Sequence, residues 1–190
     1  MCGSLSECRK KAALGLESDI ALALKELNFL DSRFNAVFTR RSSVTANGYD
    51  SICFMIATNP GEDLKPLAKI ASGGEMSRIM LAIKSALAEK DDIDSLIFDE
   101  IDTGISGRTA QMVAVKMHSI AASHQVICIT HLPQIAAMAD THFMIEKSAS
   151  DNRTKTTIKR LNEQESVCEL ARLLGGSELT EAVMANAREM

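Results

Sequence analysis

The sequence contains no tryptophan, and aromatic residues make up only 4% of it. Alanine, leucine, isoleucine and methionine must therefore form most of the hydrophobic core. No run of about 18 apolar residues occurs, so the sequence predicts no membrane-spanning helix, and the first residues do not resemble a secretory signal. We therefore expect a cytoplasmic protein without a membrane partner.

Cysteine usage and charge exclude further classes of protein. The five cysteines are scattered, odd in number and form no Cys-x-x-Cys pair. This pattern favours reduced thiols and indicates neither a disulfide framework nor a zinc site. The net charge of −4 shows that the chain is not a polycation. Any contact with nucleic acid would have to be local or supplied by another part of the protein.

The N-terminal segment has a helical pattern. Its apolar residues recur in alternating steps of three and four, as in the a and d positions of a heptad seam. The seam consists of Ala13, Leu16, Ile20, Ala23, Leu27, Leu30 and Phe34. One interpretation is the end of a coiled coil whose second strand lies outside this chain, and the other is an amphipathic helix lying on the domain. We favour the first, with a coiled-coil arm at residues 1–34 and a globular lobe at residues 35–190.

The rest of the chain has the pattern of an α/β domain. The Asn47-Gly48 pair predicts a hairpin turn, and a second hairpin is expected around residues 148–153. Apolar runs at residues 95–98 and 125–130 predict two strands buried on both faces, with a helix over about 108–122 between them. This alternation indicates a mainly parallel sheet flanked by helices. Further helices are expected after Asn162 and from Ser177.

Residues 70–78 read Ile-Ala-Ser-Gly-Gly-Glu-Met-Ser-Arg and predict the start of a helix. Ser72 is a good N-cap, and Glu75 three residues later completes a capping box. The box does not need Gly73 and Gly74, each of which costs about 1 kcal/mol in a helix relative to alanine. Glycines do leave backbone N–H groups open to a phosphate at the positive end of the helix dipole. A plain cap and an anion site are therefore both possible.

An acidic pair, Asp99 and Glu100, follows the first apolar strand. Open α/β sheets bind their ligands at the carboxyl ends of strands. Because neighbouring side chains of an extended segment point to opposite sides, the two carboxylates cannot share one role. Asp99 suits holding a hydrated Mg²⁺, and Glu100 suits orienting or deprotonating a water. The structural alternative is a pair of solvated acids.

The second apolar strand ends in His131, which is followed by Leu132 and Pro133. Pro133 suits the first position of a short helix. A histidine at this point can donate a hydrogen bond to a phosphate oxygen, or it can cap that helix. The residues alone favour a capping or core role for His131.

The three stretches together resemble the second half of an ABC-type ATPase head. In that superfamily the glycine-rich turn is the signature motif, the Asp-Glu pair is the Walker B motif and the histidine is the switch residue. The signature here reads Ala-Ser-Gly-Gly-Glu, where transporters usually have Leu-Ser-Gly-Gly-Gln, and a possible coiled coil precedes it. This arrangement is similar to that of the SMC-like chromosome and DNA-repair ATPases. The resemblance implies the C-terminal lobe of an ATPase head that takes part in DNA double-strand-break repair and recombination.

The resemblance also implies a role for each site residue. The signature turn, formed by Ser72, Gly73, Gly74 and Glu75, would press onto ATP held by a second head. Asp99 would assist Mg²⁺ through water, while Glu100 would position the attacking water. His131 would sense the γ-phosphate. The segment at residues 101–104 looks like a D-loop, which would place Asp102 at the contact between two heads.

No Gly-x-x-x-x-Gly-Lys-[Ser/Thr] motif occurs, and no glycine is followed by lysine. In SMC-like proteins this P-loop belongs to an N-terminal lobe. The implied cofactors are therefore ATP and Mg²⁺, and the implied partners are that P-loop lobe, a second head in a homodimer, and DNA bound by the full-length protein. We expect a nucleoid-associated bacterial protein whose C-terminal lobe alone does not hydrolyse ATP. The alternatives are a nucleotide-binding domain of another ABC family, such as a transporter, and a non-enzymatic dimerisation module.

Overall fold

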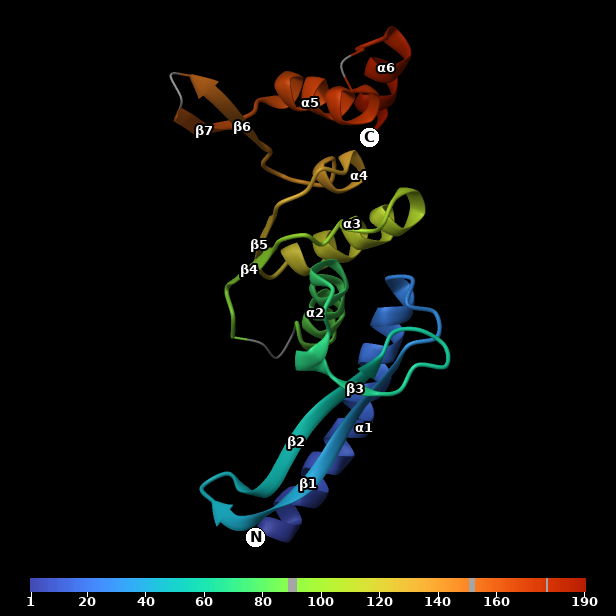
Figure 1. Cartoon of the computed structure of the whole chain (residues 1–190), viewed down its shortest axis with the longest axis vertical. Helices are drawn as coiled ribbons and strands as arrows, with labels where there is room; N and C mark the ends of the chain where they lie inside the picture. Colours follow the sequence, from blue (N-terminus) through green and yellow to red (C-terminus); the bar gives the residue numbers. More distant parts are fainter. Residues whose placement is uncertain (89–91, 151–152, 177) are drawn as a thin grey trace.

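The computed structural model describes residues 1–88, 92–150, 153–176 and 178–190. The elements, in chain order, are α1 (Cys2–Glu26), β1 (Arg33–Thr45), β2 (Gly48–Ala57), β3 (Lys65–Pro66), a 3-10 turn η1 (Leu67–Lys69), α2 (Gly73–Leu87), β4 (Ser95–Phe98), α3 (Gly107–Ala121), β5 (Gln125–Cys128), α4 (Pro133–Ala136), β6 (Phe143–Ser150), β7 (Arg153–Arg160), α5 (Glu163–Gly175) and α6 (Glu181–Glu189). They follow one another along an elongated molecule, from α1 and the β1–β2 hairpin at one end to α5 and α6 at the other (Figure 1). None of the described helices is long and apolar enough to cross a membrane.

Helix α1 lies against the domain over its C-terminal half. Ile20 and Leu24 are fully buried and join the main core together with residues of α2 and β1. The predicted heptad seam extends past the end of the helix, because Leu30 lies in an exposed turn and Phe34 belongs to β1. The amphipathic-helix interpretation therefore describes this half of α1, and a coiled-coil arm remains a prediction.

The first predicted hairpin is confirmed. Strands β1 and β2 pair antiparallel up to Thr45 and Gly48, and Gly48 adopts a φ of 86° that favours glycine. The hairpin is held to α1 by Asp50, whose carboxylate accepts hydrogen bonds from Ser6 Oγ (2.8 Å) and Arg9 Nη1 (3.1 Å). These contacts hold the N-terminal part of α1 against the hairpin, beside which the helix runs (Figure 1).

Strands β4 and β5 form the predicted parallel pair, with Ser95 opposite Gln125. They are not buried on both faces as expected. Leu96 is 8% exposed and packs into the main core, whereas Ile97 is 70% exposed and Ile127 is 45% exposed. The reason is that the core residues of α2 and α3 cover only one face of this two-stranded sheet.

The α/β class is confirmed, but parallel pairing contributes less than expected. Within the described residues the strands form three separate sheets, and β4–β5 is the parallel one; β1–β2–β3 and β6–β7 are antiparallel. The sequence predicted a mainly parallel sheet from its strand–helix–strand alternation. That alternation holds only from β4 to β5, so only this pair of the described strands is parallel. The hairpins on either side of that unit pair locally.

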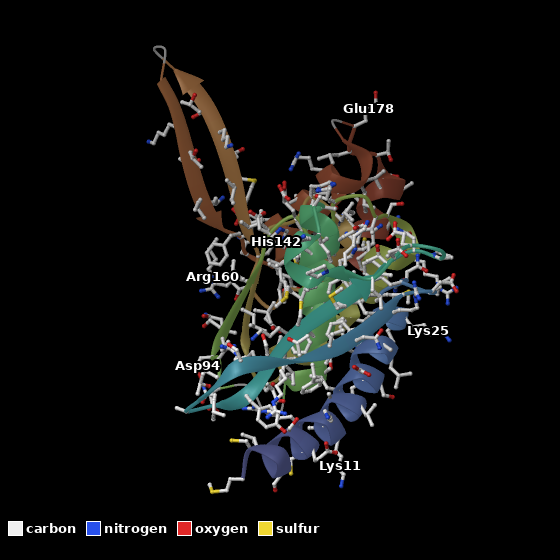
Figure 2. The ribbon with its side chains drawn as sticks, turned by 60° about the horizontal axis from the view of Figure 1, so that its bottom comes forward. Lys11, Lys25, Asp94, His142, Arg160 and Glu178 are labelled. Carbon is white, nitrogen blue, oxygen red and sulfur yellow. The ribbon has the colours of Figure 1, made fainter. Side chains whose placement is uncertain are left out.

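The C-terminal end has a small core of its own, formed by Ala136, Leu170, Ala171 and Ala187. The second predicted hairpin is present as β6–β7 and projects from the body, with Arg160 at its base (Figure 2). Residues 151–152 of the predicted turn lie outside the described residues. Asn162 caps α5 with a complete capping box. The last helix begins at Glu181 with Thr180 as its N-cap, later than expected, and Ser177 itself lies outside the described residues.

Candidate functional site

The glycine-rich turn forms the N-terminus of α2. Ser72 is its N-cap, and the Ser72 hydroxyl accepts a hydrogen bond from the backbone N–H of Glu75 (3.4 Å). The reciprocal bond from the Ser72 N–H to the Glu75 side chain is not formed within this described segment, so only half of the predicted capping box is present. The helix start is therefore confirmed, and the cap is weaker than a full box.

Both glycines of this turn stand against the loop that follows β4. A Cβ atom at position 74 would lie 2.8 Å from the carbonyl oxygen of Thr103 and 2.9 Å from its Cβ. A Cβ at position 73 would collide with the carboxylate of Glu100. Glycine is thus required at position 74, where backbone atoms of a neighbouring loop lie close, whereas the flexible Glu100 side chain can move away from a Cβ at position 73. Nothing in the local sequence indicates that α2 approaches this loop so closely.

The acidic pair forms the first part of that loop. The Glu100 N–H donates a hydrogen bond to Asp99 Oδ1 (2.9 Å), and the Ser77 hydroxyl of α2 donates to the Asp99 carbonyl (2.7 Å). Glu100 has a φ of 56°, in the left-handed region that is uncommon for residues other than glycine. The backbone is therefore not extended here, and the simple alternation of a strand does not determine where the two carboxylates point. Both residues are exposed.

Asp102 has a buried side chain. This residue is 3% exposed, and its Oδ2 atom accepts hydrogen bonds from Thr130 Oγ1 (2.6 Å) and the His131 N–H (2.7 Å). Its carboxylate ties the loop after β4 to the loop after β5 within the chain. The contact of Asp102 with a second head, which the resemblance implies, stays a prediction. The two loops meet because β4 and β5 are parallel neighbours whose carboxyl ends lie at one edge.

His131 is anchored at one side of its ring and open on the other. Its Nδ1 atom lies 2.9 Å from Asp102 Oδ2, while 72% of its side-chain surface is exposed. The N-cap of α4 is Leu132, without a side-chain cap. His131 therefore does not cap the following helix, although the residues alone favoured a capping or core role. Its ring extends to solvent beside the loop at residues 99–103, which we call the acidic loop.

Sequence reasoning missed Arg78, which is only 7% exposed. Its Nη1 atom donates to the carbonyl oxygens of Ile101 (3.1 Å) and Thr103 (2.8 Å), the two residues that flank Asp102. Burial lowers the pKa of the Arg78 guanidinium, while the charges of Glu75 and Asp102 raise it. An arginine one turn into a helix has no sequence feature that marks it as buried. The structure shows that it fastens α2 to the loop after β4.

The sequence of the chain is similar to that of known DNA repair proteins. The chain is 45% identical to the DNA repair protein RecN of Bacillus subtilis over 202 aligned residues, which cover 98% of the chain and 35% of that protein. It is 43% identical to the DNA repair protein RecN of Haemophilus influenzae, again over 98% of its own length and 34% of the relative. The chain is homologous to part of RecN. It spans about a third of the length of these RecN relatives. No protein-family model matches the chain.

The fold of the chain is similar to that of solved SMC structures. The SMC head domain of Pyrococcus yayanosii, solved with a coiled coil and joint, superposes with a TM-score of 0.59 at 20% identity, over 86% of this chain and 29% of that one. A structure described under ATP-driven dimerization and DNA-stimulated activation of SMC ATPases gives 0.54 at 18% identity, over 90% of this chain and 99% of that one. At these identities the likeness concerns the fold, which is that of an SMC head.

Proposed function

We propose that this chain is the C-terminal lobe of an SMC-like ATPase head and that the whole protein hydrolyses ATP during DNA double-strand-break repair and recombination. One observation carries the proposal. The glycine-rich turn and His131 are far from the Asp-Glu pair in the sequence, yet both contact the loop at residues 99–103, which begins with that pair. The proposed role in DNA repair is supported by the RecN relatives, which are named DNA repair proteins.

The turn at residues 72–75 supplies the contact with the nucleotide. Its backbone N–H groups lie at the N-terminus of a helix of 15 residues, where the helix dipole favours an anion. In our proposal this anion is the γ-phosphate of an ATP bound by the P-loop of a second head. ATP then bridges two heads, and its hydrolysis releases them.

The acidic loop suits a Mg²⁺ ion that keeps most of its water. Asp99 Oδ1 is engaged by the Glu100 N–H, and Asp99 is exposed. No group of three or more His, Cys, Asp or Glu side chains able to hold a metal occurs among the described residues. A metal held by one carboxylate, by waters and by substrate phosphates fits this donor set. When bound, Mg²⁺ would neutralise phosphate charge.

Glu100 and His131 are the groups proposed to act on the reaction itself. Glu100 is exposed beside the Asp99 carboxylate and would orient the water that attacks the γ-phosphate. His131 presents an exposed ring at the adjacent loop and would contact that phosphate. The Glu100 carboxylate already packs against the helix N-terminus at Gly73.

The proposed partners complete the site. An N-terminal lobe with a P-loop supplies the phosphate cradle, a second copy of the head closes over ATP, and DNA is bound by the full-length protein. ATP-driven dimerization is part of the description of one SMC structure with the same fold. We place the protein in the cytoplasm of a bacterium, in association with the nucleoid. We expect this chain alone to be inactive as an ATPase.

The decisive experiment measures steady-state ATP turnover by this chain alone and after mixing with the P-loop segment of the same protein. We expect turnover only in the mixture, with a loss of at least about 100-fold in Glu100→Gln, because the group that orients water is then neutral. Glu178→Gln, an exposed glutamate far along the chain, is the matched control and is expected to retain activity. A well-folded mixture without turnover would favour the non-enzymatic dimerisation module, and normal turnover by Glu100→Gln would contradict the role of Glu100.

A further inference from the structure

Strands β6 and β7 form a basic hairpin on an acidic chain. Residues 143–160 contain five lysines and arginines against two acidic residues, which gives this segment a net charge of +3. Because the whole chain carries −4, all the other residues together carry −7. Positive charge is thus concentrated on one element, which projects from the body of the molecule with Arg160 at its base (Figure 2). Such a local basic surface is typical of a site that binds a polyanion.

Four of these cations form two pairs on opposite faces of the hairpin. The strands pair antiparallel in a continuous register, with Ser148 opposite Lys155. Since side chains alternate between the faces along each strand, Lys155 shares a face with Ser148, and Lys147 lies on the other face. Lys159 and Arg160 are consecutive and therefore also lie on opposite faces, at the base of the hairpin. The two pairs are separated along β7 by about 13 Å.

Three of the four cations are free to bind a ligand. Lys159 forms an ion pair with Glu165 (2.6 Å). Lys147, Lys155 and Arg160 are exposed and form no ion pair with any residue that the structure describes. The same two strands carry exposed hydroxyl residues, namely Ser148, Thr156 and Thr157. Cations and hydroxyls are the side chains that hydrogen-bond the phosphate oxygens of nucleic acids.

The placement of cations on both faces fits double-stranded DNA better than a flat acidic surface of a protein. A flat surface approaches one face of the hairpin and leaves the cations of the other face unpaired. The major groove of DNA is about 12 Å wide, admits a two-stranded β-ribbon and has a phosphate backbone on each side. We propose that the β6–β7 hairpin binds DNA and that Lys147, Lys155 and Arg160 contact backbone phosphates. The proposal rests on the proposed function for the choice of DNA as the polyanion.

The first test measures the affinity of the chain for a fluorescent DNA duplex by anisotropy at several salt concentrations. The variant replaces the three free cations together, as Lys147→Gln/Lys155→Gln/Arg160→Gln. Each lost phosphate contact lowers the slope of log K against log salt by about 0.9, so we expect the slope to fall by about 2–3. An unmodified chain that does not bind the duplex would overturn the proposal. A triple variant with an unchanged slope would also overturn it.

The matched control makes the same change of net charge at exposed positions outside the hairpin, as Lys11→Gln/Lys25→Gln/Arg188→Gln. We expect this variant to keep the affinity and the salt slope of the unmodified chain. Equal losses in the two triple variants would show that only net charge matters and would overturn the role of the hairpin. Poly-glutamate is tested in place of DNA. Binding of poly-glutamate but not of the duplex would make the partner an acidic protein and would overturn the proposal.

The second test uses the unmodified chain and does not depend on how a variant folds. Its lysines are acetylated briefly with and without the duplex and are then identified by mass spectrometry. We expect DNA to slow the acetylation of Lys147 and Lys155 and to leave that of Lys11 and Lys25 unchanged. Equal protection of all four lysines, or protection of none, would overturn the proposal.

Neither test needs ATP or the P-loop segment. If the reconstituted mixture has no ATP turnover, the proposed function fails as an ATPase, and the two DNA measurements still decide the role of the hairpin. If the mixture turns over ATP and both DNA measurements fail, the hairpin proposal is wrong and the ATPase proposal stands.

Discussion

The guanidinium of Arg78 donates a hydrogen bond of 2.8 Å to the carbonyl of Thr103, and the same Nη1 atom reaches the carbonyl of Ile101 at 3.1 Å. One buried side chain of α2 therefore satisfies two carbonyls of the loop that carries Asp102. The ring of Phe29 lies near this guanidinium, with 5.7 Å between the Arg78 Cζ atom and the ring centroid. This one cation therefore helps to fix the position of the loop.

Replacing Arg78 with methionine keeps much of the side-chain length and removes both donors. Because the buried Ile101 carbonyl and the partly buried bond to the Thr103 carbonyl would both lose their donor, we expect the free energy of unfolding to fall by about 2–3 kcal/mol in urea titrations. The control is Arg188→Met on an exposed position of α6, with an expected change within about 0.5 kcal/mol. Equal effects of the two substitutions would show that the buried contacts contribute nothing.

Gly74→Ala tests whether the glycine pair is required for packing. Alanine is the better helix former by about 1 kcal/mol, but its Cβ would meet the Thr103 backbone oxygen at 2.8 Å. We therefore expect a lower melting temperature for Gly74→Ala. Gly15→Ala in α1 is the matched control, because a Cβ there meets nothing within 4 Å, and its melting temperature is expected to rise. A rise in both variants would argue against the close approach of α2 to the loop.

Two leucines of α1 test whether the helix packs on the domain. Leu24 is 0% exposed and Leu22 is 62% exposed, although they are two residues apart. Leu24→Ala is expected to lower the free energy of unfolding by about 2–5 kcal/mol, as for other buried leucines. Leu22→Ala is expected to change it by less than about 0.5 kcal/mol. Denaturant titration of both variants measures the difference, and similar losses would mean that Leu22 is also covered.

Cys128 is expected to be the slowest thiol to react. Burial, followed by the charges of Asp102 and Asp99, raises the pKa of its thiol to about 12. Since only the thiolate is nucleophilic, alkylation at about pH 8 followed by mass spectrometry should label the exposed Cys8 and Cys53 long before Cys128. In urea the unfolded chain should label all five cysteines at similar rates. Equally fast labelling of folded Cys128 would contradict this environment.

The same shift gives a pH dependence with a defined sign. The folded chain keeps the Cys128 proton up to about pH 12, whereas the unfolded chain releases it near the ordinary pKa of about 8.5. The unfolded state therefore binds fewer protons in this window. The contribution of Cys128 to stability is complete below about pH 8.5 and is lost as the pH rises towards 12. Comparing Cys128→Ala with the unmodified chain in urea at several alkaline pH values isolates this contribution.

Local sequence patterns predicted the parts of the fold that depend on local interactions. The Asn47-Gly48 turn, the Ser72 and Asn162 caps and the strand at residues 95–98 were all predicted, because turn, capping and apolar-run preferences act within a few residues. The exposed face of β4 at Ile97 was not predicted. An apolar run shows that a strand can be buried on both sides, but not how many neighbours cover it.

The candidate site was predicted as a set of residues and not as a set of contacts. Asp99, Glu100 and His131 follow strands whose carboxyl ends meet, which the strand–helix–strand pattern indicates. The burial of Asp102 depends on donors from residues 130–131, and that of Arg78 on carbonyls more than twenty residues away. Such long-range pairing has no local signature. The bonds of Asp102 within its own chain were therefore not predicted, and its contact with a second head stays a prediction.

The elongated arrangement of the elements has a thermodynamic consequence. The folded chain exposes 12399 Å² of surface, whereas a compact monomer of 20.6 kDa would expose about 8,900 Å². Unfolding therefore uncovers less new surface than the chain length suggests. Because the denaturant m-value and the heat-capacity change both scale with that newly exposed area, both are expected to be smaller than for a globular protein of equal length. Its stability curve would consequently be broad and shallow, with little dependence on temperature around its maximum.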